Sequence, residues 1–203
     1  MKGYYFVSDT VLSAAGMLND VRSAVNAGAK LIQYREKNVD TAVMYKKACE
    51  IKAICRDGNS KVIINDRVDI ALAVDADGVH IGQSDMPYEI ARRLLGNNKI
   101  IGVTVHNVTE AIEAERLGAD YLGVSPIFST HTKTDAGNPC GLDTLKKIRQ
   151  ECAIPIAAIG GIDSENVDEV IEAGADMVCM ISAVIQSSNV TNEILQIQRR
   201  FRL

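Results

Sequence analysis

The 203-residue chain contains no tryptophan, three histidines, four prolines and only nine aromatic side chains, six tyrosines and three phenylalanines. So few aromatic rings argue against a surface on which nucleic-acid bases stack. Lys and Arg number 22 against 26 Asp and Glu, a balance that indicates no nucleic-acid or anionic-membrane partner. No uncharged apolar run approaches the roughly 20 residues of a membrane span, and the first residues lack a signal-peptide layout. We therefore expect no nucleic acid and no membrane among the partners.

Cysteine and histidine are also too sparse and too poorly spaced to form a recognisable site. An odd number of cysteines without C-x-x-C spacing disfavours a disulfide framework and a cysteine-based metal cluster, so we expect mostly buried thiols in a reducing cytoplasm. The histidines share no metal-ligand spacing. No Ser-His-Asp or Cys-His arrangement is legible, so the sequence offers no candidate protein nucleophile. The five cysteines are Cys49, Cys55, Cys140, Cys152 and Cys179.

What the chain does have is a regular alternation of short β-branched runs and helix-length amphipathic stretches. The apolar runs are nearly continuous, which is typical of parallel strands buried on both faces. Eight such units without a composition break or linker predict a single α/β domain over residues 1–203, a (β/α)8 TIM barrel, with an open doubly wound sheet as the main alternative. The predicted strands are Tyr4–Ser8, Leu31–Arg35, Val62–Asn65, Gly78–Ile81, Ile100–Val105, Tyr121–Ser125, Ile156–Ile159 and Met177–Ile181.

Local signals mark the helix ends. Asn107 followed by Glu110 has the spacing of a capping box, and Asp40 and Ser164 are expected to cap two further helices. A weak repeat joins helices to strands, in which a Gly permits a left-handed helix end and a small Ala lets the next strand begin close by. Its copies are Asn26-Ala27-Gly28-Ala29-Lys30, Asp75-Ala76-Asp77-Gly78, Leu117-Gly118-Ala119-Asp120 and Ala173-Gly174-Ala175-Asp176.

Polar side chains gather where the predicted strands end, the place where such barrels carry their chemistry. The alternation of a strand points Gln33, Arg35 and Lys37 the same way, toward the barrel axis. A guanidinium and an ammonium on one face favour an anion such as a phosphate or diphosphate. The alternative is an internal ion pair with Glu36 or another carboxylate, although Glu36 is expected to point the opposite way.

Two carboxylates, Asp66 and Asp85, follow adjacent predicted strands and should lie near each other at the barrel rim. With the amides of Asn65 and Gln83 beside them, they form an oxygen-rich pair suited to Mg²⁺. The alternative is that each caps the helix that follows it. The neighbouring cations favour the metal, because Mg²⁺ and cationic side chains together hold a diphosphate.

A second anion site is predicted from the later strands. The loop of about fifteen residues after the sixth strand is long enough to need a function or disorder. Its segment Thr130-His131-Thr132-Lys133 offers two threonine hydroxyls and a lysine ammonium. Gly160-Gly161 and Ser182 follow the last two strands, where such barrels often bind phosphate; a tight turn is the alternative for the glycines. The roles of His80, inside the fourth strand, and of His106 are left open.

Six segments in order along nearly the whole chain resemble the thiamine phosphate synthase (thiamine-phosphate pyrophosphorylase) family. The resemblance implies a TIM-barrel transferase that joins a hydroxymethylpyrimidine diphosphate to a hydroxyethylthiazole phosphate and releases pyrophosphate. It departs from the family at Ser125, where we expect Gly, and at Ser129, where many relatives have Pro. The segments are Gln33-Tyr34-Arg35-Glu36-Lys37, Ile64-Asn65-Asp66-Arg67-Val68-Asp69, Gly78-Val79-His80-Ile81-Gly82-Gln83-Ser84-Asp85, Ile127-Phe128-Ser129-Thr130-His131-Thr132-Lys133, Ile159-Gly160-Gly161-Ile162 and Met180-Ile181-Ser182-Ala183.

The resemblance also implies roles for individual residues. The metal, Mg²⁺, would be held by Asp66 and Asp85, and a small homo-oligomer is favoured. The catalytic residues would be Arg35, Lys37 and Thr104. The pyrimidine diphosphate would contact Gln33, Arg35, Lys37, Asn65, Thr104 and Lys133, and the thiazole phosphate would contact Thr130, Thr132, Gly161, Ile181 and Ser182.

Two other functions remain open at this point. One is a thiazole tautomerase of the same barrel family, and the other is a non-catalytic barrel that binds a phosphorylated metabolite. An isomerase needs neither Mg²⁺ nor a diphosphate site, so Arg35, Lys37, Asp66 and Asp85 argue against the tautomerase.

Overall fold

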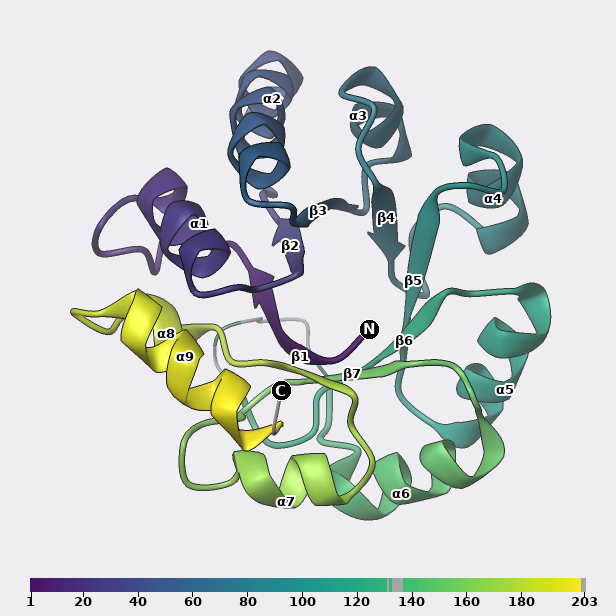
Figure 1. The fold of residues 1–203 in the computed structure, drawn as a ribbon. Helices are drawn as coiled ribbons and strands as arrows, with labels where there is room; N and C mark the ends of the chain where they lie inside the picture. The colour runs from purple at the N-terminus through teal and green to yellow at the C-terminus, as the bar shows by residue number, and fades with distance from the viewer. Residues whose placement is uncertain (131, 133–136, 202–203) are drawn as a thin grey trace.

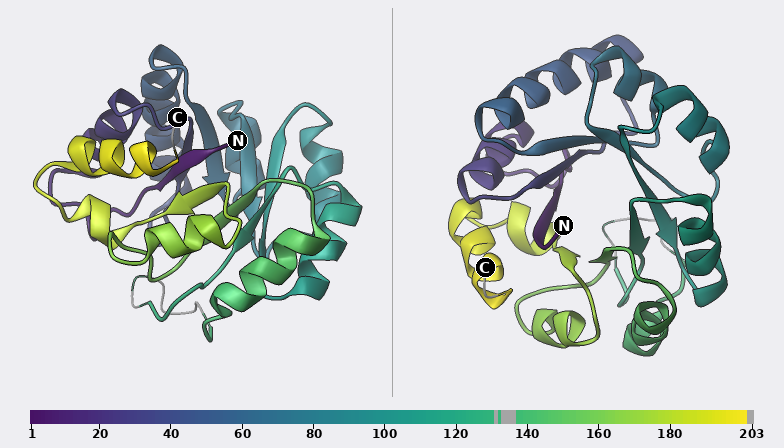
Figure 2. Two further views of the ribbon diagram at one scale, coloured as in Figure 1. Left: turned by 60° about the horizontal axis from the view of Figure 1, so that its bottom comes forward. Right: turned by 45° about the vertical axis from the view of Figure 1, so that its right-hand side comes forward.

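A computed structural model describes residues 1–130, 132 and 137–201 of the chain. Eight parallel strands form a closed barrel in chain order, and helices surround it (Figures 1 and 2). The first and last strands pair, with Gly3 opposite Met177, so the predicted barrel is confirmed and the open sheet is excluded. The strands are β1 (Gly3–Val7), β2 (Leu31–Tyr34), β3 (Lys61–Asn65), β4 (Gly78–Ile81), β5 (Ile100–Val105), β6 (Tyr121–Val124), β7 (Ile156–Ile159) and β8 (Met177–Cys179).

Helices connect each strand to the next on the outside of the barrel. A short helix, α8, follows the last strand, and α9 packs against α1 and β1 to complete the ring beside the start of the chain (Figure 1). The helices are α1 (Met17–Asn26), α2 (Thr41–Asp57), α3 (Val68–Ala73), α4 (Tyr88–Leu95), α5 (Val108–Leu117), α6 (Gly141–Glu151), α7 (Val167–Glu172), α8 (Ser182–Ile185) and α9 (Val190–Arg200).

The core has two layers, because each strand is buried on both faces. Tyr4 and Phe6 of β1 pack outward against the helices, whereas Tyr5 and Val7 point into the barrel. This explains why the strands read as continuous apolar runs and not as an alternation. Inside the barrel the Tyr121 ring lies against Gly102, where an added Cβ would come within 2.0 Å of it. A side chain at that position would displace the ring from the interior layer.

The repeat seen in the sequence has a structural role at the floor of the barrel, where the strands begin. In three of its copies an aspartate precedes an even-numbered strand, and its carboxylate accepts the backbone N–H of the residue opposite it on the preceding strand. These contacts satisfy amide groups that the ladder alone leaves unpaired. The bonds are Val62 to Asp77 at 2.8 Å, Ile101 to Asp120 at 2.8 Å and Ile156 to Asp176 at 2.9 Å.

The first copy of the repeat has Lys30 in place of the aspartate. The register places Lys30 opposite Tyr4, and an ammonium cannot accept the Tyr4 N–H. Gln198 of α9 supplies the acceptor instead, with its Oε1 3.1 Å from the Tyr4 nitrogen. Helix α9 therefore supplies to β1 the side-chain acceptor that an aspartate carboxylate supplies to β3, β5 and β7.

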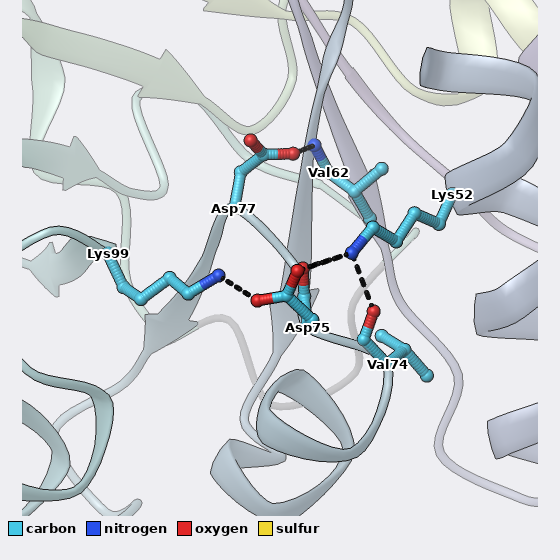
Figure 3. Close-up of polar contacts among 6 residues, drawn as sticks. All are labelled: Lys52, Val62, Val74, Asp75, Asp77 and Lys99. Carbon is cyan, nitrogen blue, oxygen red and sulfur yellow. Dashed lines mark hydrogen bonds and ion pairs between the residues drawn. The ribbon is translucent and has the colours of Figure 1, made fainter. Parts of the chain in front are cut away.

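A network of charges at the same end of the barrel links α2 to the turns before β4 and β5 (Figure 3). The carboxylate of Asp75 lies 3.0 Å from the Lys52 ammonium and 2.5 Å from that of Lys99. Lys52 also donates to the Val74 carbonyl at 2.8 Å. The two ammonium groups lower the pKa of Asp75 to about 2. This network joins three connecting segments on the side of the barrel away from the predicted site.

The predicted helix ends are confirmed in one case and corrected in two. The Asn107 side chain accepts the Glu110 N–H at 3.0 Å, and the Glu110 carboxylate reaches back to the His106 N–H. Asp40 stands before α2 but makes no capping bond with its side chain. Ser164 is not a cap, because α7 begins later, after Asn166.

Candidate active site

A cavity of about 580 Å³ opens where the carboxyl ends of the strands meet. It brings together every predicted site residue that the structure describes, from strand exits that lie far apart in the sequence. Lys133 and His131 lie outside the described residues. The predicted residues that line the cavity are Gln33, Arg35, Lys37, Asn65, Asp66, Asp85, Thr104, Thr130, Thr132, Gly161, Ile181 and Ser182.

The cationic side of the cavity is formed by residues just past the carboxyl end of β2, which contact the residue that follows β1. The Arg35 N–H donates to the Ser8 hydroxyl at 2.9 Å, and this contact fixes the backbone just past the end of β2. Within the part of the chain that the structure describes, the Arg35 guanidinium forms no ion pair. Glu36 points elsewhere, as expected, and accepts from the Thr10 hydroxyl at 2.6 Å. The Arg35 fork is therefore available to an anion in the cavity.

Lys37 is placed differently from the prediction of a purely anion-binding cation. Its ammonium lies 3.6 Å from a carboxylate oxygen of Asp66. The ion-pair alternative therefore describes Lys37 in part, with Asp66 and not Glu36 as the partner. The Lys37 side chain is 43% exposed, and a pair this open to water is weak enough for a strong anion to compete with it.

The two carboxylates face each other across the exits of β3 and β4. Asp66 has a left-handed backbone, with φ at 61°, and its N–H donates to the His80 carbonyl at 2.8 Å. Asp85 accepts the Gly82 N–H at 2.7 Å. Arg67 and Pro87, not these aspartates, stand at the starts of α3 and α4. The helix-cap alternative is therefore wrong for both.

The electrostatics of this pair suit a positively charged partner. Burial, followed by the nearby Asp85 carboxylate, raises the pKa of Asp66 to about 6, and Lys37 offsets only part of that rise. Two like charges held together in a partly buried site are relieved either by a proton or by a metal ion. Within the described residues no group of three or more His, Cys, Asp or Glu side chains could hold a metal. A pair of carboxylates is the donor set that Mg²⁺ uses when waters and substrate phosphates supply its other ligands.

The glycine pair after β7 forms a tight turn that also lines the cavity. Both residues have left-handed backbones, with φ of 101° at Gly160 and 64° at Gly161. A Cβ on Gly161 would lie 2.6 Å from the Ser129 carbonyl oxygen. The Phe128 N–H donates to the Gly160 carbonyl at 3.0 Å. The turn is therefore needed for the loop after β6 to approach β7, and the tight-turn alternative is confirmed. Phosphate binding by these glycines stays a prediction.

The interior of the barrel below the cavity contains a chain of hydrogen-bonded side chains. Gln33 donates from Nε2 to the Tyr5 hydroxyl at 2.7 Å, which lies 2.7 Å from the Tyr121 hydroxyl. The Tyr121 hydroxyl is 2.9 Å from Nδ1 of His80. His80 Nε2 is in turn 2.8 Å from the Thr104 hydroxyl. Burial raises the pKa of both tyrosine hydroxyls, so both stay protonated.

This series of hydrogen bonds shows what His80 contacts, and it includes two tyrosines that were not predicted as site residues. His80 is a buried, hydrogen-bonded residue that contacts Thr104, whereas His106 lies at the cavity edge 2.9 Å from the Glu110 carboxylate. Tyr5 and Tyr121 were missed because a tyrosine within an apolar strand looks like core packing. The available signal was chemical, since a buried tyrosine hydroxyl needs a hydrogen-bond partner.

An eight-stranded barrel whose cavity at the carboxyl ends of the strands joins two cationic side chains, two carboxylates and a glycine turn has the architecture of a (β/α)8 enzyme. Comparison with known proteins narrows this class. The family model described as thiamine monophosphate synthase matches residues 4–184, a span that includes every predicted site residue. The chain belongs to the thiamine monophosphate synthase family and is a transferase, which confirms the resemblance.

Individual members of the family are similar to this chain over most of their length. The thiamine-phosphate synthase of Methanosarcina mazei is 52% identical over 202 residues, which cover 98% of this chain and 84% of the relative. That of Chloroflexus aurantiacus is 50% identical over 195 residues, 96% of this chain and 90% of the relative. The solved structure of thiamine phosphate pyrophosphorylase from Pyrococcus furiosus superimposes with a TM-score of 0.90 at 39% identity, over 98% of this chain and 95% of that one.

Within the described residues, no helix is both long and apolar enough to cross a bilayer.

Proposed function

We propose that the chain joins 4-amino-2-methyl-5-hydroxymethylpyrimidine diphosphate to 4-methyl-5-hydroxyethylthiazole phosphate, forming thiamine phosphate and releasing pyrophosphate. The observation that carries the proposal is the meeting of Arg35, Lys37, Asp66 and Asp85 around one cavity. Such a set of cations and carboxylates suits a diphosphate that must depart with its negative charge neutralised. The names of the relatives point to the same reaction.

The cationic side chains are proposed to bind and then stabilise the leaving group. Arg35 would offer its planar fork to two phosphate oxygens, and Lys37 would add a point charge beside it. Gln33 and Asn65 line the cavity next to them and would contact the same substrate. Lys133, which lies outside the described residues, is proposed as a further contact for the diphosphate.

Asp66 and Asp85 would hold Mg²⁺, which when bound supplies positive charge to the diphosphate oxygens. The raised pKa of Asp66 supports this assignment, because a cation beside this carboxylate would favour its ionised form. Asp85 is oriented by the Gly82 N–H, so one of the two candidate ligands is already fixed by the backbone.

The bond changes proposed here need no protein nucleophile. The bond between the hydroxymethyl carbon and the diphosphate oxygen breaks, and its electron pair leaves with pyrophosphate. The electron-rich aminopyrimidine stabilises the resulting cation, and the thiazole nitrogen donates its lone pair to form the new C–N bond. Thr104 would contact the pyrimidine, and the thiazole phosphate would be bound by Thr130, Thr132, Gly161, Ile181 and Ser182.

An assay with each substrate omitted in turn tests the proposal. With both phosphorylated heterocycles and Mg²⁺ present, thiamine phosphate and pyrophosphate should form in equal amounts, and neither should form when one heterocycle is left out. Isomerisation of a thiazole phosphate alone would indicate the tautomerase. Binding of either heterocycle without turnover would indicate a non-catalytic barrel. Either result would overturn the proposed function.

A further inference from the structure

The series of hydrogen-bonded side chains inside the barrel, called here the hydrogen-bond chain, connects two residues of the cavity wall through the interior. It begins at Gln33 and ends at Thr104, both of which line the cavity. Between them lie Tyr5, Tyr121 and His80. Both tyrosines are fully buried and His80 is 4% exposed, so these polar groups need hydrogen-bond partners within the protein.

The number of protons in the chain fixes the direction of its hydrogen bonds. Each tyrosine has one proton, and Gln33 donates to the Tyr5 oxygen, so Tyr5 must donate to Tyr121. Tyr121 then donates to Nδ1 of His80, which leaves Nε2 as the protonated nitrogen of a neutral imidazole. His80 therefore donates to the Thr104 oxygen. The reverse order would require Gln33 to turn its carbonyl oxygen toward Tyr5.

This direction determines what the two ends offer to a ligand. Thr104 accepts from His80, so its own proton is left to donate. Gln33 gives an amide proton to Tyr5, which leaves its carbonyl oxygen to accept. Two residues of the cavity wall thus present a donor proton at Thr104 and an acceptor oxygen at Gln33, and three buried side chains maintain this arrangement.

We propose that His80, Tyr121 and Tyr5 are positioning residues that make Thr104 a donor and Gln33 an acceptor, and that this polarity selects an aminopyrimidine edge. The identity of the heterocycle rests on the proposed function. An aminopyrimidine offers an amino donor next to a ring-nitrogen acceptor, which complements the two ends. The 4-oxo analogue offers a carbonyl acceptor next to a ring N–H donor, so the Gln33 carbonyl oxygen would meet another acceptor and the Thr104 proton would lose its acceptor.

The first experiment measures discrimination between two substrates. kcat/KM is determined for the 4-amino pyrimidine diphosphate and for its 4-oxo analogue, in the wild type and in Tyr121→Phe. The phenyl ring retains the packing of Tyr121 against His80 and Tyr5, but the variant interrupts the chain. We expect the preference of the wild type for the amino substrate to fall about tenfold or more, because one buried hydrogen bond is lost and its neighbours are left unpaired.

Two further variants keep this test decisive. Tyr88→Phe removes a hydroxyl from α4 that donates to the Gly118 carbonyl, away from the cavity, and should leave the preference unchanged. Tyr5→Phe interrupts the chain at its other tyrosine and replaces Tyr121→Phe if that variant does not fold. An equal loss of kcat/KM for both substrates would overturn the proposal. An unchanged preference in a folded Tyr121→Phe or Tyr5→Phe variant would overturn it too.

The second experiment reads the direction of the chain without any substrate. In protein labelled with ¹⁵N-histidine, NMR distinguishes a protonated Nε2 from a protonated Nδ1, and His80→Gln assigns the signal. We expect the Nε2–H tautomer at His80, and a shift of the tautomer population in Tyr121→Phe. An Nδ1–H tautomer would overturn the inferred direction. If the wild type forms no thiamine phosphate while the tautomer is as expected, the proposed function fails and the direction of the chain stands.

Discussion

The Lys37 ammonium and the Asp66 carboxylate are 3.6 Å apart at the mouth of the barrel. One is a proposed ligand for the diphosphate and the other a proposed ligand for Mg²⁺, so this ion pair places the two proposed sites side by side. A magnesium diphosphate complex would give each group a new partner of opposite charge, the metal for the carboxylate and the phosphate for the ammonium.

Lys37→Ala should reduce the rate of diphosphate departure by about 10²–10³-fold, since a positive group that faces developing charge is removed. Single-turnover measurement of pyrophosphate release isolates this step. Lys47→Ala is the matched control, because Lys47 also lies near a carboxylate, that of Glu50 at 3.7 Å, but on the surface of α2. A Lys37→Ala enzyme as fast as this control would assign Lys37 a structural role.

Removal of the metal should abolish turnover, and Asp85→Asn should weaken Mg²⁺ binding. The carboxylate pair supplies two of the metal ligands in the proposed site, and an amide oxygen is a poorer ligand for a hard cation. Mg²⁺ titration of activity should show a half-saturating concentration at least tenfold higher in Asp85→Asn. Product formation that continues at the full rate in excess EDTA would remove the metal role from both aspartates.

Asp66→Asn should stabilise the metal-free protein above pH 6. The pKa of this carboxyl rises from its ordinary value to about 6 on folding, so the folded state holds the additional proton between about pH 4 and pH 6. Stability of the wild type should therefore fall as the pH rises through this window and level off above it. The variant lacks this decline and should gain on the order of 1–2 kcal/mol at pH 7. Asn also tolerates the left-handed backbone at this position.

Unfolding by urea across this pH range, with and without Mg²⁺, measures the effect. Mg²⁺ should remove most of the difference, because it stabilises only the wild-type pair. A variant that is less stable than the wild type in metal-free buffer at pH 7 would contradict the argument.

Gly161→Ala should destabilise the protein and weaken binding of the thiazole phosphate. The new Cβ would lie 2.6 Å from the Ser129 carbonyl oxygen, so the loop after β6 would have to move away from β7. Gly28→Ala is the control, because Gly28 has a similar left-handed backbone, with φ at 84°, but no described neighbour within 4 Å of the added atom. The control should cost about 1–2 kcal/mol of backbone strain and leave substrate binding intact. An equal loss in both variants would show that strain alone, and not the approach of the loop, matters at Gly161.

The sequence was sufficient to predict the barrel because buried parallel strands leave continuous apolar runs that few other folds produce. The site was predictable for a related reason: strand exits converge in a barrel, so Gln33 and Ser182 can be placed on one rim without knowledge of their distance. The family resemblance added the roles, which spacing alone does not provide. These roles remain predictions for each residue, although the cavity brings together all of those that the structure describes.

Contacts between side chains on distant strands could not be predicted from the sequence. The pairing of Lys37 with Asp66 depends on side-chain rotamers as well as on register. The tyrosine–histidine chain depends on which inward-facing positions lie at the same height in a closed barrel. The cap predicted at Ser164 failed because Asp163 accepts the Glu165 and Asn166 N–H groups, so the chain turns once more before α7 begins.

The bond from the Tyr4 amide to the Gln198 side chain joins residues 194 positions apart. During translation the first strand leaves the ribosome long before its partner in α9 exists, and neither β8 nor the helix beside it can yet protect that edge. Because domains assemble as units once their segments have emerged, β1 stays unpaired along this edge until both β8 and α9 have been synthesised, so the barrel cannot close strand by strand as it is made.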